Sequence, residues 1–218
     1  VVENSWASVF NDDKKLIAFS DSVQDAAHRA GFFGARTYLN NVRTALAHAM
    51  DELRQPVMPW SDFLVALEQR FHTPGSVLNM PREEFVAEFI APNMTWQHDW
   101  SVELLQHNRL PPESRLPGRV KNRILWQAYS ELTYQSQKGR TLERIGKAVL
   151  TVPWPALEEV ARELLPRYQE QYRAQGLELK TVTQWLWGML THMRRRGGVM
   201  HPELTAYAAD GNLFGLLK

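Results

Sequence analysis

The sequence of 218 residues contains no cysteine. This absence excludes disulfide bonds, cysteine zinc sites, iron–sulfur clusters and thiol catalysis, and it fits a reducing compartment. No apolar run approaches the roughly 20 residues of a membrane-spanning helix, and the N-terminal segment lacks the basic start and apolar middle of a signal peptide. We therefore expect a cytoplasmic protein with no membrane partner.

A strong net charge is also missing, since 25 Lys and Arg balance 24 Asp and Glu. The balance is uneven along the chain, however. Residues 1–114 carry 9 basic and 15 acidic side chains, residues 115–147 carry 8 and 2, and residues 148–218 carry 8 and 7. The basic block over 115–147 is interpreted either as a surface for a polyanion or as an ordinary solvated helix face, and both interpretations stay open.

Helical periodicity dominates the chain. Helices are expected over about 22–54, 61–71, 81–90, 94–107, 119–137, 155–175, 181–196 and 202–209, and Pro166 should bend or split the helix that contains it. Apolar β-branched runs predict two short strands, at about 15–19 and 147–152. A buried strand without a partner leaves backbone groups unsatisfied, so we expect these two strands to be neighbours. The predicted fold class is a mainly α, multi-helix domain with two short β-strands.

Motifs of common enzyme classes do not occur in the sequence. There is no Gly-rich loop ending in Gly-Lys-Ser/Thr, no Asp-Glu-x-Asp/His box and no Gln-x-x-Gly-Arg-x-x-Arg sequence, so nothing predicts a nucleotide phosphate or magnesium site. The seven histidines form no His-Glu-x-x-His pair, and no Gly-x-Ser-x-Gly elbow is present. We predict no catalytic residue and no metal site in this chain, and no ATP hydrolysis by the chain alone.

A family resemblance begins at the first predicted strand. KLIAFSDSVQDAAHRAGFF followed by RTYLNNVRTAL, within residues 15–46, resembles motif IV at the opening of the second RecA-like domain of large bacterial superfamily 2 DEAD/DEAH-box helicases. Residues 139–152 and 185–199 resemble the downstream part of that domain, where a helical insertion interrupts it before motifs V and VI. The resemblance implies a non-catalytic fragment of an ATP-dependent helicase or translocase, with ATP and Mg as cofactors of the intact parent only.

The same resemblance implies a domain organisation. Residues 1–54 would be the start of the second RecA-like domain, 55–137 the helical insertion, and 138–218 a strand with the C-terminal helices. The two predicted strands would then be a remnant of a RecA-like α/β sheet. The implied partners are the rest of the parent chain and DNA or RNA, which the sequence does not distinguish.

Nucleic-acid contacts are expected from two sources. Motif IV is expected to set the backbone of the tracked strand against the strand-to-helix turn, and helix N-terminal N–H groups attract phosphate. Basic residues supply the rest. Arg119 and Arg123, four residues apart, share a helix face, and further Lys and Arg side chains lie downstream. The predicted contacts are Ser20, Ser22, Gln24, Arg119, Arg123, Lys138, Arg140, Arg194, Arg195 and Arg196.

A second hypothesis, an autonomous helical protein-interaction module, also stays open. The acidic N-terminal half and the weak net charge favour it. Trp185 and Trp187, in an apolar helical segment, are expected in core or interdomain packing, and Trp96 and Trp100 could stack on each other or on a base. The three arginines at 194–196 end a predicted helix, where cations complement the helix dipole.

Overall fold

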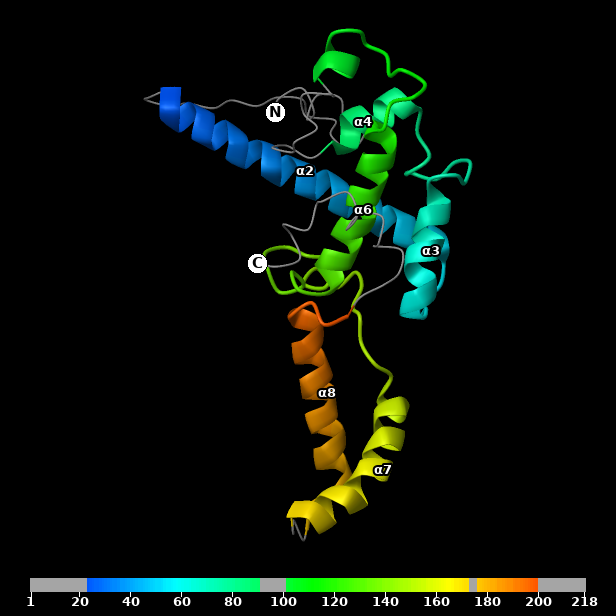
Figure 1. Ribbon diagram of the computed structural model, residues 1–218, viewed down its shortest axis with the longest axis vertical. Helices are drawn as coiled ribbons and strands as arrows, with labels where there is room; N and C mark the ends of the chain where they lie inside the picture. Colours follow the sequence, from blue (N-terminus) through cyan, green and yellow to red (C-terminus); the bar gives the residue numbers. More distant parts are fainter. Residues whose placement is uncertain (1–22, 91–100, 173–175, 200–218) are drawn as a thin grey trace. The chain divides into compact units, whose positions relative to one another are not determined.

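The computed structural model describes residues 23–90, 101–172 and 176–199, and in these residues it is mainly helical (Figure 1). The predicted mainly α architecture is confirmed. The elements are α2 (Val23–Leu53), α3 (Trp60–Arg70), α4 (Arg82–Phe89), the short π-helix η1 (Ser101–Leu105), α6 (Leu116–Leu132), α7 (Trp154–Tyr172) and α8 (Leu179–Arg195).

The described residues group into two compact units, and the division falls between Ala128 and Tyr129, inside α6. Unit 1 contains the described residues 23–90 and 101–128. Unit 2 contains the described residues 129–172 and 176–199. Each unit has its own buried residues.

Unit 1 is built on one face of α2. Its buried residues recur at helical spacing, as the sequence predicts: Tyr38, Val42, Ala45, Leu46 and Ala49. α2 contacts α3 and α4, which bury Leu64, Leu67, Phe85, Val86 and Phe89. Within the described part of α2, the helical spacing of the apolar residues therefore coincides with the buried face.

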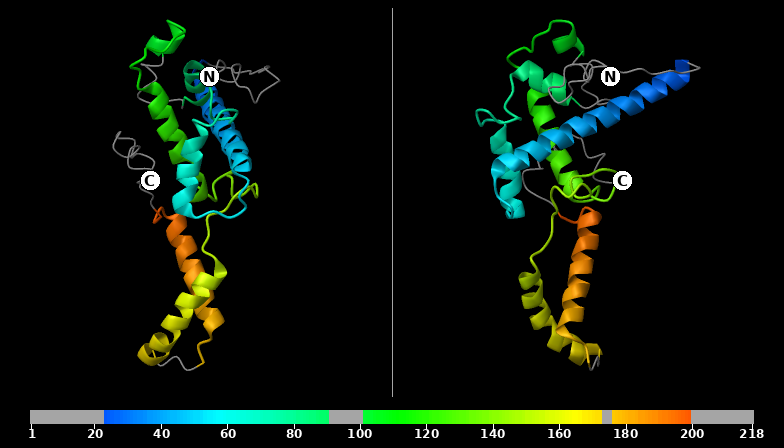
Figure 2. Two further views of the ribbon diagram at one scale, coloured as in Figure 1. Left: turned by 90° about the vertical axis from the view of Figure 1, so that its right-hand side faces the viewer. Right: turned by 180° about the vertical axis from the view of Figure 1, so that it is seen from behind.

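Unit 2 contains a helical hairpin of α7 and α8 (Figure 2). Leu157, Ala161, Val182 and Leu186 form its buried seam, flanked by partly buried leucines. α7 continues through Pro166, and its axis bends part-way along (Figure 1), as expected for a residue that cannot donate a helix hydrogen bond. The expectation of core packing for two tryptophans is wrong within unit 2, because Trp185 is 52% and Trp187 is 47% exposed.

The strand predicted at 147–152 is not confirmed. Residues 148–153 form neither helix nor strand, and the part of the chain that the structure describes contains no strand. The physical reason is the lack of a partner among the described residues, since a strand exists only when its backbone groups pair. The other predicted strand, 15–19, lies outside the described residues, as does the predicted helix at 202–209.

Two predicted helix boundaries also differ from the structure. The helix predicted over 119–137 ends at Leu132, where the Thr133 hydroxyl donates to the Tyr129 carbonyl at 2.7 Å and the chain enters a series of turns. Of the helix predicted over 94–107, the described part contains η1, while Trp96 and Trp100 lie outside the described residues. Within the described ranges, no helix combines the length and apolar character needed to cross a bilayer.

Candidate nucleic-acid interface

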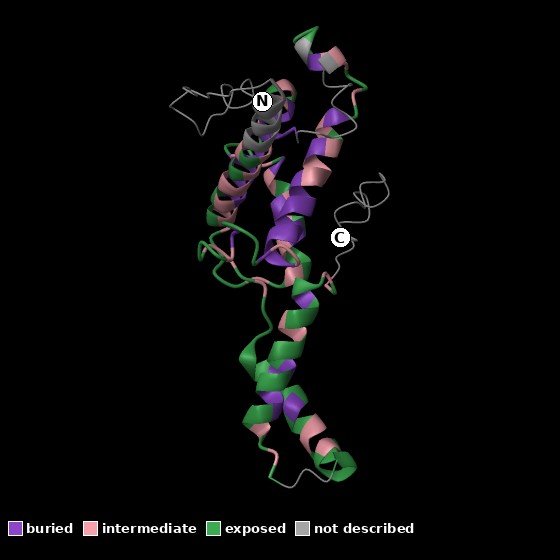
Figure 3. Ribbon diagram, turned by 90° about the vertical axis from the view of Figure 1, so that its left-hand side faces the viewer, coloured by how far each residue is buried: buried purple, intermediate pink, exposed green. Residues whose placement is uncertain are grey.

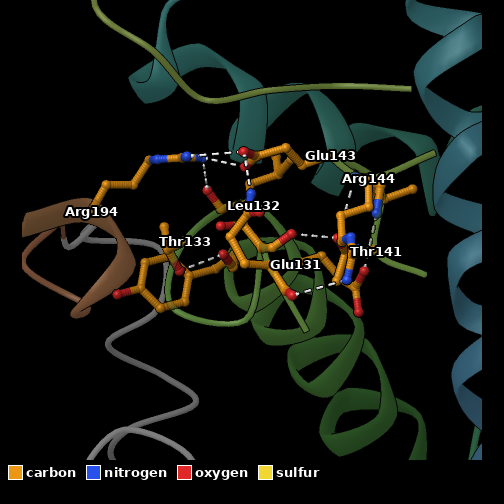
Figure 4. A network of polar contacts seen from close by, with 11 residues as sticks. Glu131, Leu132, Thr133, Thr141, Glu143, Arg144 and Arg194 are labelled. Atoms are coloured by element: carbon orange, nitrogen blue, oxygen red, sulfur yellow. Dashed lines mark hydrogen bonds and ion pairs between the residues drawn. The ribbon is translucent and has the colours of Figure 1, made fainter. Parts of the chain in front are cut away.

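A buried arginine organises the polar groups of unit 2 (Figure 4). Arg194, 6% exposed, lies in the last turn of α8. Its Nη1 donates to Glu143 Oε2 at 2.6 Å and to the Leu132 carbonyl at 2.9 Å, and its Nη2 donates to Glu143 Oε1 at 3.2 Å. Paired hydrogen bonds between ionised groups are stronger than neutral ones. This network fixes the end of α8 to the loop over 133–147.

The loop over 133–147 is itself held by hydrogen bonds between side chains and its backbone. Buried Glu131 accepts a hydrogen bond from the Leu142 N–H at 3.2 Å, and the Thr141 hydroxyl donates to the Ser136 carbonyl at 2.5 Å. Gln137 donates to Glu143 at 2.7 Å. Because these contacts satisfy buried polar groups, the loop has a defined shape without being a helix or strand.

The charge of Glu143 is stabilised by its surroundings. Burial alone pushes the pKa of Glu143 upward, but hydrogen bonds from Arg194 and the charge of that guanidinium act in the opposite direction, with a smaller contribution from Arg195. The net effect lowers the pKa of Glu143 below its ordinary value of 4.5. At neutral pH the carboxylate and the guanidinium therefore compensate each other inside the fold.

Five exposed cations lie in the two segments that this ion pair joins, the loop over 133–147 and the end of α8, and we call them the basic surface: Lys138, Arg140, Arg144, Arg195 and Arg196. Arg144 follows Glu143 in the chain and donates to the Gln137 carbonyl at 3.4 Å. Arg195 follows Arg194 directly, and its positive charge contributes to the lowered pKa of Glu143. The ion pair thus joins the loop over 133–147, which carries Lys138, Arg140 and Arg144, to the end of α8, which carries Arg195 and Arg196.

The structure separates the predicted contact residues into groups. Lys138, Arg140, Arg195 and Arg196 belong to the basic surface, whereas the guanidinium of Arg194 is taken up by Glu143 and Leu132. Arg119 and Arg123 lie on α6 in unit 1, half-buried and engaged in contacts of their own. Gln24 is the second residue of α2, and Ser20 and Ser22 lie outside the described residues.

Another cation of the basic block, Lys121, has a structural role in unit 1. Its Nζ lies 2.8 Å from a Glu68 carboxylate oxygen, 3.4 Å from His72 Nε2 and 5.4 Å from the centre of the Phe71 ring. These contacts connect α6 to the end of α3. Within the basic block, Lys121 therefore makes structural contacts in unit 1, whereas Lys138, Arg140 and Arg144 are exposed in unit 2.

Sequence reasoning missed Arg144 as a member of the interface and Glu143 as its organiser. Arg144 lies inside the basic block, so its charge was a usable signal. The pairing of Glu143 with Arg194 carries no local signal, because 51 residues separate them. Such a contact is visible only in the three-dimensional structure.

Metal chemistry finds no support in the part of the chain that the structure describes, where no three His, Asp or Glu side chains gather as ligands.

Comparison with protein-family models finds no match to this chain, and searches of curated proteins and of solved structures find none either. The helicase resemblance therefore rests on the sequence of residues 15–46, 139–152 and 185–199.

Proposed function

We propose that this chain binds the phosphate backbone of DNA or RNA through the basic surface of unit 2. The observation that carries the proposal is the ion pair between Arg194 and Glu143, because it joins the two segments that carry five exposed cations and compensates the one carboxylate within the pair. Lys and Arg that neutralise phosphates release condensed counterions and give affinity that is independent of sequence. The surface would therefore position a strand without reading its bases.

We further propose that the chain serves as a non-catalytic part of an ATP-dependent helicase or translocase in the cytoplasm. Residues 15–46 support this role through their resemblance to motif IV. Ser20, Ser22 and Gln24 would then add contacts to the tracked strand, and the intact parent would bind ATP and Mg.

The RecA-like remnant sheet is part of the same proposal. Residues 147–152 would pair with residues 15–19 as neighbouring strands. Two observations support the pairing: the run Val149-Leu150-Thr151-Val152 is rich in β-branched residues, and its backbone groups make no hydrogen bond to the rest of the described chain. A segment of this composition, whose backbone has no hydrogen-bond partner among the described residues, is suited to adding a strand.

Fluorescence anisotropy with a labelled single strand tests the binding proposal. Five phosphate contacts predict a log–log salt slope of about −3.5 on single strands, and each lost contact should reduce it by about 0.7. Lys138→Ala/Arg140→Ala and Arg195→Ala/Arg196→Ala should each weaken binding about tenfold at low salt. The control is Arg162→Ala/Arg167→Ala, which removes two exposed cations of α7 outside the basic surface.

The proposal predicts that the control binds like the wild type. No binding at low salt, or equal losses in all three double variants, would refute a defined basic surface.

The protein-interaction hypothesis remains the second candidate, and a specific observation favours it. Among the described residues, ten of the twelve large apolar side chains that are exposed belong to unit 2. Contiguous exposed apolar surface marks interaction sites in soluble proteins.

A further inference from the structure

Helix α8 has a second apolar face besides the one that packs on α7. Val182 and Leu186 lie in the buried seam of the hairpin. Trp185, Met189 and Met193 recur at intervals of four residues, so they share one side of the helix. They are 52%, 37% and 45% exposed. We call these three residues the α8 stripe.

The α8 stripe continues onto α7 through aromatic contacts. The rings of Tyr168 and Trp185 lie nearly perpendicular with centroids 6.1 Å apart, and Tyr172 stacks on Tyr168 with centroids 5.7 Å apart. Exposed positions cover most of both helices in Figure 3. Methionine side chains adapt to the shape of a partner surface, and aromatic side chains supply large contact area. These residue types are typical of a protein contact rather than of a solvated face.

The two helices of the hairpin carry opposite charges. α7 contains four Glu and two Arg, for a net charge of −2. α8 contains one Lys, two Arg and no acidic residue. Since Glu143 compensates only Arg194, the remaining charge of α8 is still positive. The surface that complements α8 in charge is therefore an acidic amphipathic helix, and α7 of a second copy is one.

We propose that two copies of this chain associate through the α8 stripe, with α8 of each copy packed against α7 of the other. A two-fold axis makes both contacts equivalent and completes a four-helix arrangement from two hairpins. Each face is small, because helices of 17 and 19 residues are only about 26 and 29 Å long. We expect weak association, with a dissociation constant on the order of micromolar.

Sedimentation equilibrium of the full chain, over roughly 1 to 200 µM and after nuclease treatment, tests the dimer. We expect a monomer–dimer equilibrium in the wild type. Met189→Glu and Met193→Glu should each raise the dissociation constant at least about tenfold, because each places a charge in an apolar contact. The matched control is Trp187→Glu, which alters a similarly exposed residue about 200° around α8 from Trp185.

A second pair of variants tests the charge argument. Glu159→Lys/Glu163→Lys reverses two exposed charges of α7 and should weaken the dimer severalfold at low salt. Lys138→Ala/Arg140→Ala should leave the dimer unchanged while weakening nucleic-acid binding, so the two proposals can fail separately. Circular dichroism of each variant checks that its helices remain folded.

Three outcomes would overturn the dimer proposal. One is a wild type that stays monomeric at all concentrations, and another is a dimer as sensitive to Trp187→Glu as to Met189→Glu. The third is a loss of single-strand binding in Met189→Glu, because that result would assign the α8 stripe to nucleic acid instead.

Discussion

The Arg194 guanidinium and the Glu143 carboxylate form an ion pair with Nη1 and Oε2 2.6 Å apart, across a sequence separation of 51 residues. Their side chains are 7% and 15% exposed. Each charge therefore depends on the other for most of the interactions that water would otherwise provide. The pair joins the last turn of α8 to the loop that follows α6, and both halves of the basic surface depend on it.

Removal of either partner should destabilise unit 2. Arg194→Ala removes the charged donor of the Glu143 carboxylate and the donor to the Leu132 carbonyl, and we expect a loss of about 2–3 kcal/mol in the free energy of unfolding. Urea denaturation followed by circular dichroism measures it. Arg195→Ala, one residue further on and exposed, is the matched control and should change stability by less than about 0.5 kcal/mol. Equal effects of the two variants would contradict a structural role for the pair.

The ion pair should also make stability depend on pH. Because the pKa of Glu143 is lowered in the folded state, its contribution is complete above the ordinary value of 4.5 and is lost as the pH falls through the lowered value. The comparison is the urea midpoint of wild type against Glu143→Gln. We expect the wild type to be more stable at about pH 7, with the difference shrinking as the pH falls below the ordinary pKa of 4.5 and through the lowered pKa of Glu143. A difference that persists unchanged at low pH would show that the charge of Glu143 is not its source.

The start of α4 should hold a loop of unit 1 in place. Glu83 Oε1 accepts a hydrogen bond from the Leu110 N–H at 3.1 Å, and this bond is the largest cause of the lowered pKa of Glu83. Glu83→Gln weakens the acceptor, so the Leu110 amide should exchange its hydrogen severalfold faster. Hydrogen exchange read by NMR measures this, with Glu84→Gln at the neighbouring exposed position as control. An unchanged rate at Leu110 in Glu83→Gln would disprove the contact.

Alanine substitutions at two glycines, one inside α8 and one just past its end, should change the free energy of unfolding in opposite directions. A Cβ at Gly188 would meet nothing within 4 Å, so Gly188→Ala should stabilise the helix by about 0.5–1 kcal/mol. Gly197 has φ of 78° and ends α8 in a Schellman motif, with the Gly198 N–H donating to the Met193 carbonyl at 2.8 Å. Gly197→Ala should cost about 1–2 kcal/mol, since side chains disfavour that conformation. Thermal unfolding compares the two, and effects of the same sign would contradict this assignment.

Local sequence signals predicted much of the helical fold. The stripe from Tyr38 to Ala49 reports the buried face of α2 because helical spacing and burial coincide there. α8 shows where this logic stops: it has apolar residues on two sides, and spacing alone does not say that Leu186 packs on α7 while Trp185 remains half exposed. Periodicity identifies a helix more reliably than it identifies the face that the rest of the chain covers.

Other features depended on contacts that sequence patterns do not contain. The β-branched run from Val149 to Val152 has strand propensity, yet the described residues offer it no partner. Of the nucleic-acid contacts that the sequence predicts, Lys138, Arg140, Arg195 and Arg196 were chosen for charge and are exposed in the structure. Charge alone did not separate them from Arg194, whose burial depends on a glutamate far away in the chain.

The division of the chain inside α6 bears on any attempt to study the two units in isolation. The boundary between Ala128 and Tyr129 lies within a continuous helix whose residues on both sides are buried. Proteases cleave exposed, locally unfolded segments, so limited digestion should spare this boundary and cut elsewhere. Expression of either half with an end at residue 128 would sever the helix and expose buried apolar residues of α6 next to the break. A useful truncation should therefore retain all of α6.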